Sequence, residues 1–170
     1  MTEILLVRHG QTDWNLEHRV QGHTDTPLNA AGIEQARALA ESLAAVPLVA
    51  VYSSDLARAR DTAAEVARVH GLEVALDRDL REKNFGSWEG MTDAEIAVRF
   101  PHAVRGRWGD GEATEEVAER AVAAMGRIRA LHPAGPVLVV AHGGPLRAIL
   151  DHLAVEHGRI GNCEVFRVRY

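Results

Sequence analysis

Short apolar runs alternate with longer amphipathic segments along this chain. Residues 4–7, 48–52 and 137–141 are apolar throughout, as is typical of strands buried on both faces of a parallel sheet. A weaker strand is expected at 73–76. The amphipathic segments predict helices at 30–45, 56–70, 92–100, 114–132 and 145–153. Strands that alternate with helices predict an α/β fold, a three-layer α/β/α sandwich with a mainly parallel sheet.

The first predicted helix illustrates the pattern. Asn29 is suited to cap its N-terminus, and Ile33, Ala36, Ala40 and Leu43 recur at helical spacing. These four side chains are therefore expected to face the core.

The C-terminal segment 164–170 alternates apolar and basic side chains, a pattern that predicts an edge strand. An exposed strand edge could pair with a second copy in a homodimer.

The chain length of 170 residues fits one domain, and no repeat or long linker divides it. We therefore expect a single domain over 1–170, with residues 91–114 as a candidate lid. Arg99, Arg105 and Arg107 lie around this lid, and we interpret them as solvated charges.

Composition excludes several functions. The net charge of −5 provides no basic field for nucleic acid or an anionic membrane, and no apolar run approaches the about 18 residues of a membrane span. Cys163 is the only cysteine, so an internal disulfide is excluded and a reducing, cytoplasmic location is expected. No His-Glu-x-x-His or His-x-His pattern occurs, and we predict neither a metal nor a cofactor.

Two distant strands end in the same way, at Arg8-His9-Gly and at Ala-His142-Gly-Gly. Ligands of open α/β sheets bind outside the carboxyl ends of the strands, so both imidazoles are expected to meet there. Arg58, in the first turn of the helix after the second strand, joins the same edge. Because guanidinium groups match phosphate oxygens, the expected ligand is a phosphate monoester.

This cluster predicts phosphoryl transfer. Surrounding cations would keep His9 neutral, and a neutral imidazole can attack phosphorus to give a phosphohistidine. Arg8, Arg58 and His142 would stabilise the charge on the phosphoryl group without a metal. Glu82 is the expected general acid, with Glu89 as the alternative.

The run Leu-Val-Arg-His-Gly-Gln-Thr, with Asn15 shortly after it, resembles the signature of the histidine phosphatase, or phosphoglycerate mutase-like, superfamily. The blocks around Arg58, Glu82 and His142 stand in the order of that family. The resemblance implies a phosphoglycerate mutase-like fold and catalytic roles for Arg8, His9, Arg58, Glu82 and His142. It further implies that Asn15 and the Gly143 N–H contact the phosphate, and that Gln21 and Gly22 line the substrate side.

Two features favour the phosphatase branch of this family. The segment after Glu82 is shorter than in the mutases, and the run Phe85-Gly-Ser-Trp-Glu-Gly is similar to α-ribazole and broad-specificity phosphatases. We therefore expect a metal-independent phosphomonoesterase that acts on a small phosphorylated metabolite. A 2,3-bisphosphoglycerate-dependent mutase and an inactive phospho-ligand binding module are the alternatives.

Overall fold

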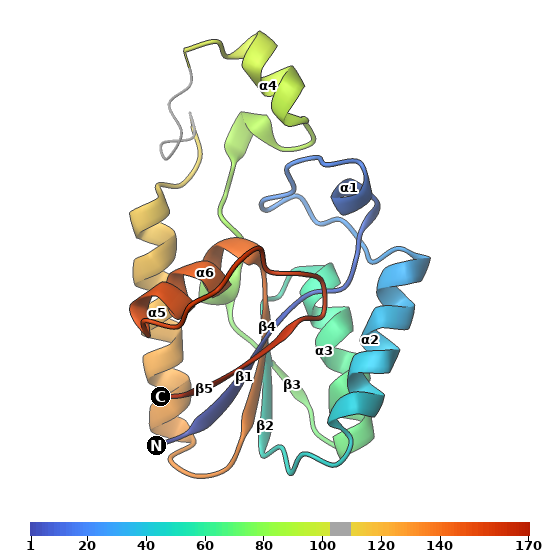
Figure 1. The fold of residues 1–170 in the computed structure, drawn as a ribbon, viewed down its shortest axis with the longest axis vertical. Coiled ribbons are helices and arrows are strands. Elements are labelled where there is room, and N and C mark those ends of the chain that lie inside the picture. The colour runs from blue at the N-terminus through green and yellow to red at the C-terminus, as the bar shows by residue number, and fades with distance from the viewer. Residues whose placement is uncertain (103–109) are drawn as a thin grey trace.

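The computed structural model describes residues 1–102 and 110–170 (Figure 1). Within them one sheet has the strand order β3-β2-β4-β1-β5. Its strands are β1 (Glu3–Arg8), β2 (Ala50–Ser53), β3 (Val74–Leu76), β4 (Val137–Ala141) and β5 (Val165–Arg169). The first four are parallel, and β5 pairs antiparallel with β1. The predicted mainly parallel sheet is confirmed.

Helices cover both faces of this sheet (Figure 1). The long helices are α2 (Ala30–Leu43), α3 (Ala57–His70), α5 (Thr114–Leu131) and α6 (Gly143–His152). Successive residues of a strand point to opposite faces. Leu5 and Val7 of β1 accordingly belong to the core with α2 and α3, and Ile4 and Leu6 belong to the core with α5 and α6. The three-layer sandwich is thus confirmed.

Shorter elements occupy the connections. They are α1 (Asp13–Leu16), the 3₁₀ turns η1 (Arg78–Leu80) and η2 (Gly86–Trp88), and α4 (Asp93–Arg99). The prediction of a helix at 92–100 is confirmed. Helix α1 lies in a polar stretch for which the sequence predicts no helix; it forms because Thr12 and Asn15 cap each other in a capping box.

The prediction that Ile33 faces the core is wrong, since this side chain is 38% exposed. Gly32 is the residue that faces inward at this turn of α2. An added Cβ on Gly32 would overlap the carbonyl oxygen of Gln11. The first turn of α2 therefore rests directly on the backbone that follows β1, and this close approach rotates Ile33 outward.

Strand β5 forms one edge of the sheet, as predicted, with Arg167 and Arg169 exposed and Val168 buried. Pairing of this edge in a homodimer stays a prediction. Helix α4 lies in the predicted lid beyond the carboxyl edge of the sheet (Figure 1). Arg105 and Arg107 lie outside the described residues. No helix in the described ranges is long and apolar enough to cross a membrane.

Two glycines within helices provide a matched test of this packing. Gly32→Ala is expected to lower the free energy of unfolding by about 2 kcal/mol, because the methyl group meets backbone that cannot rotate away. Gly126→Ala on α5, where an added Cβ meets open space, is expected to raise it by about 0.5–1 kcal/mol. Urea unfolding of both variants measures the difference, and equal effects would contradict the close approach of α2.

Candidate active site

Pairing of β1 with β4 brings His9 and His142 together at the carboxyl edge of the sheet. Arg8 is in register with Ala141, and the backbone N–H of His9 donates to the carbonyl of Ala141 at 3.0 Å. The two rings lie with their centroids 5.1 Å apart, and the residues are 2% and 0% exposed. The sequence expectation that both imidazoles meet at this edge describes their placement correctly.

One hydrogen bond determines which nitrogen of His9 is reactive. Its Nδ1 lies 2.7 Å from the carbonyl oxygen of Gly10. Since a carbonyl oxygen can only accept, Nδ1 carries the proton. Nε2 of the neutral ring therefore bears the lone pair that a nucleophile needs.

The backbone around His9 is held from both sides. The Thr62 hydroxyl donates to the carbonyl of Arg58 at 2.7 Å and accepts from the Gly10 N–H at 3.0 Å. On the other side, the Asn162 carboxamide donates to the His9 carbonyl at 2.8 Å, and the Cys163 N–H donates to the Arg8 carbonyl at 2.8 Å. Thr62 and Asn162 were not found from the sequence, because Gly10 and His9, whose backbone they hold, lie far away along the chain.

Arg8 and Arg58 lie at the same edge of the sheet as the two histidines. Part of each guanidinium group is hydrogen-bonded to backbone carbonyl oxygens. Arg8 donates to the carbonyl of Ile160 at 2.7 Å. Arg58 is fully buried and donates to the carbonyls of Gly22 at 2.7 Å and Thr24 at 3.0 Å. These bonds fix both side chains before any ligand arrives.

Four polar atoms at this centre are buried without a partner among the described residues. They are Nε of Arg8, Nε of Arg58, and Nδ1 and Nε2 of His142. An unsatisfied buried polar group costs about 1–3 kcal/mol. Their convergence indicates a site built for a polar ligand, and the two guanidinium groups select an anion.

Electrostatics keeps both histidines neutral. Burial, followed by the charges of Arg58 and Arg8, lowers the pKa of His9 well below its ordinary value. Burial, Arg58, His9 and Arg8 lower the pKa of His142 in the same way. Burial also lowers the pKa of Arg58 to about 10, so this side chain keeps its charge at neutral pH.

Glu82 faces the N-terminus of α6. Its carboxylate accepts hydrogen bonds from the Gly144 N–H at 3.1 and 3.3 Å and from the Lys83 N–H at 2.8 Å. An added Cβ on Gly144 would overlap this carboxylate, so a larger residue there would displace the Glu82 side chain. The partial positive charge of a helix N-terminus favours an anion at this position. Gly143, whose N–H is a predicted phosphate contact, is the first residue of the same helix.

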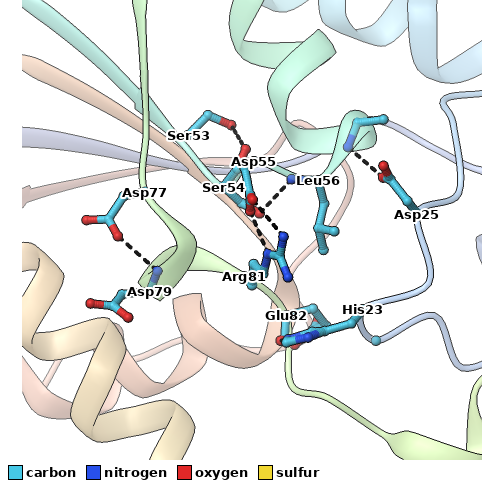
Figure 2. Close-up of polar contacts among 12 residues, drawn as sticks. His23, Asp25, Ser53, Ser54, Asp55, Leu56, Asp77, Asp79, Arg81 and Glu82 are labelled. Carbon is cyan, nitrogen blue, oxygen red and sulfur yellow. Dashed lines mark hydrogen bonds and ion pairs between the residues drawn. The ribbon is translucent and has the colours of Figure 1, made fainter.

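The backbone of Glu82 is fixed by two side chains. His23 and Arg120 donate to its carbonyl oxygen at 2.8 and 2.9 Å. Figure 2 shows the His23 ring against Glu82 and, beside it, Arg81 paired with Asp55. The Arg81 guanidinium makes two bonds to the Asp55 carboxylate, at 2.6 and 2.7 Å. The loop that carries Glu82 is thereby attached to the turn after β2.

Glu89, the alternative general acid, lies between two loops and not at the N-terminus of α6. Its carboxylate accepts hydrogen bonds from the backbone N–H groups of His23, Thr24 and Phe85 at 2.8, 2.8 and 3.1 Å. These bonds join the loop around Gly22 to the loop after Glu82. The geometry therefore gives Glu89 a bracing position and Glu82 the position beside α6.

The remaining predicted residues lie in the loop after β1. Asn15 accepts from the Thr12 N–H at 3.1 Å and from Asn162 at 3.3 Å. Gln21 is buried and accepts from the hydroxyls of Thr12 and Thr26 at 2.8 and 2.6 Å. Gly22 presents its carbonyl to Arg58. All three support the site in this structure, and their contact with a ligand stays a prediction.

In residues 1–102 and 110–170, no group of three or more His, Cys, Asp or Glu side chains could hold a metal ion.

Comparison with known proteins gives consistent matches. The family model described as "Histidine phosphatase superfamily (branch 1)" matches residues 4–170. A metal-independent phosphoserine phosphatase of Arabidopsis thaliana is 42% identical over 178 residues, covering 97% of this chain and 75% of that protein. Phosphoglycerate mutase-like protein 4 of the same plant is 39% identical over 160 residues, covering 88% and 70%. The structure of a mycobacterial glucosyl-3-phosphoglycerate phosphatase in complex with VO3 has a TM-score of 0.88 at 34% identity, covering 97% of this chain and 90% of that one.

The two neutral histidines predict acid sensitivity of the fold. An unfolded histidine has a pKa of about 6.5, whereas the folded values are lowered. As the pH falls below about 6.5, the unfolded chain takes up protons that the folded chain does not. The free energy of unfolding should then decrease by up to about 1.4 kcal/mol per pH unit for each histidine, and be constant with respect to these groups at higher pH.

Urea unfolding between about pH 5 and pH 8 measures this slope. His142→Asn should reduce this slope by the contribution of one histidine. A wild-type stability that does not change below pH 6.5 would contradict the neutral pair.

Proposed function

Because this chain belongs to branch 1 of the histidine phosphatase superfamily, we propose that it is a metal-independent phosphomonoesterase that hydrolyses a small phosphorylated metabolite. One observation carries the proposal: Nε of Arg8, Nε of Arg58 and both ring nitrogens of His142 are buried without a partner among the described residues, and the His142 ring lies 5.1 Å from that of His9. The relatives named as phosphatases support hydrolysis as the reaction.

In the first step, Nε2 of His9 attacks phosphorus and the bond from phosphorus to the ester oxygen breaks. Glu82, protonated, gives its proton to the departing alkoxide. Arg8, Arg58 and His142 donate hydrogen bonds to the phosphoryl oxygens, where negative charge is spread during transfer. Asn15 and the Gly143 N–H complete this set. The product is a phosphohistidine whose Nδ1 keeps its proton and still donates it to the Gly10 carbonyl.

In the second step, the Glu82 carboxylate takes a proton from water, and the water oxygen attacks phosphorus. The bond from Nε2 to phosphorus breaks, inorganic phosphate leaves, and His9 returns to its neutral form. The hydrogen bond from Nδ1 of His9 to the Gly10 carbonyl supports both steps, because it fixes the ring with Nε2 directed toward the substrate. No metal enters either step.

A mutase is the second candidate, because one relative is named phosphoglycerate mutase-like. In that reaction the phosphohistidine would return its phosphoryl group to a bound phosphoglycerate. The two reactions differ in the acceptor that reaches phosphorus, water or a second hydroxyl group. We favour water, because the relatives include proteins named as a phosphoserine phosphatase and a glucosyl-3-phosphoglycerate phosphatase.

A cytoplasmic location remains part of the proposal, supported by the single cysteine of the chain.

Hydrolysis of p-nitrophenyl phosphate in EDTA tests the reaction. The wild type is expected to turn over, and His9→Ala to lose at least about 10³-fold in kcat, because the nucleophile is removed. Brief incubation with substrate should label the wild type with an acid-labile phosphate that His9→Ala lacks. Activity that depends on a metal or survives the loss of His9 would contradict the proposal. Faster mutase turnover of 3-phosphoglycerate, primed with 2,3-bisphosphoglycerate, would favour the second candidate.

Pre-steady-state kinetics can distinguish the roles of Glu82 and Glu89. The p-nitrophenolate ion leaves without a proton, so Glu82→Gln should still phosphorylate His9 but release phosphate slowly. A burst of one p-nitrophenol per enzyme followed by turnover reduced about 10²-fold or more is expected. With glycerol 3-phosphate, whose alkoxide needs the proton, this variant should give no burst.

Glu89→Gln is the matched control. It weakens the bonds between two loops and is expected to lower stability without producing a burst. The reverse result, with a burst in Glu89→Gln and normal turnover in Glu82→Gln, would assign the proton transfer to Glu89.

A further inference from the structure

A cavity of about 560 Å³ opens beside the predicted phosphate position and extends between α5 and α6. Arg8, Glu82 and Gly143 line its inner end. Its walls continue along α5 through Val117 and Ala118. The cavity is therefore where the part of a substrate beyond the phosphate would lie.

One wall of the cavity is a single face of α6. Gly143, Arg147 and Asp151 line it at intervals of one helical turn. Arg147 lies about 6 Å along the helix axis from Gly143. Arg159 lines the same cavity and precedes Ile160, whose carbonyl accepts from Arg8. Two guanidinium groups from separate segments thus border one space.

These two arginines differ from most others in the described ranges. Arg81, Arg120 and Arg127, for example, each pair with a carboxylate. Arg147 and Arg159 form no ion pair or hydrogen bond with any residue in 1–102 or 110–170. Both line the same cavity as Arg8. Burial lowers the pKa of Arg8, and the charges of Arg159 and Arg147 lower it further.

The acidic residues of the cavity are already engaged. Glu82 accepts from the first turn of α6, and Asp151 accepts from His157 at 3.0 Å. The hydrogen bond to the Gly158 carbonyl, followed by the one to Asp151, raises the pKa of His157. The cavity therefore keeps an excess of positive charge in a protein whose net charge is −5.

Part of the cavity lining is apolar. Val117 and Ile160 are each 2% exposed, and Ala118 and Ala148 extend the same surface. Such a lining suits a short carbon skeleton and offers few hydrogen bonds to a hydroxylated one.

We propose that Arg147 and Arg159 form a second anion subsite, so that the preferred substrate is a phosphate monoester carrying a second anionic group on a short carbon skeleton. The group is a carboxylate or a second phosphate, both of which match a guanidinium. This inference rests on the proposed phosphatase function.

Pairs of substrates that differ in the second anion test it, each pair compared by the ratio of its two kcat/KM values. Glycerol 3-phosphate differs from 3-phosphoglycerate in a hydroxymethyl group that replaces the carboxylate. Propyl phosphate is set against propane-1,3-diol bisphosphate for a second phosphate. The wild type is expected to favour the doubly anionic member of at least one pair by about tenfold or more. The pair that shows the preference identifies the group.

The Arg147→Gln, Arg159→Gln double variant should bring that ratio to within about twofold of unity. The ratio of the two kcat/KM values is measured because a general loss of activity lowers both values equally and leaves their ratio unchanged. Arg169→Gln, an exposed arginine on β5 that does not line the cavity, should keep the wild-type ratio. Wild-type ratios near one in both pairs, or a ratio that the double variant preserves, would overturn the subsite. Failure to hydrolyse p-nitrophenyl phosphate at all would instead reject the phosphatase function.

Discussion

The parallel pairing of β1 with β4 is the constraint on which the candidate site depends. Its register sets Arg8 opposite Ala141, so the residues that follow both strands leave the sheet side by side. His9 and His142 are 133 positions apart in the sequence, yet no loop has to bring them together. The sheet, buried between two helical layers, places both rings. A site attached in this way has the rigidity of the core.

The loops around this edge are joined mainly through backbone groups. Thr62 and Asn162 hold the segment around His9, and His23 and Arg120 hold the carbonyl of Glu82. Each bond acts on a peptide group and leaves the reactive side chain available. Preorganised groups of this kind are effective in phosphoryl transfer, because the polar environment needs no rearrangement during the reaction.

The strands, most helices and the convergence of the two histidines could be predicted, because apolar periodicity and strand endings are local signals. The orientation of α2 could not be predicted from the sequence. Periodicity favours Ile33 as a core residue, and only the contact of Gly32 with a distant backbone segment rotates the helix. The supporting residues Asn162 and Arg120 were equally inaccessible. A polar residue in a loop or on a helix has no recognisable signature until its partner is known.

Four arginines of the candidate site and its cavity divide into two pairs with different evolutionary freedom. Arg8 and Arg58 lie in the candidate site and also bond to loop carbonyls, so a substitution there would disturb the architecture together with the proposed chemistry. Arg147 and Arg159 stand on the wall of the cavity without bonds to any described residue. Exchange of either would alter the shape and charge presented to a substrate at little cost to folding. The scaffold can therefore keep one reaction while the choice of substrate changes from one descendant to the next.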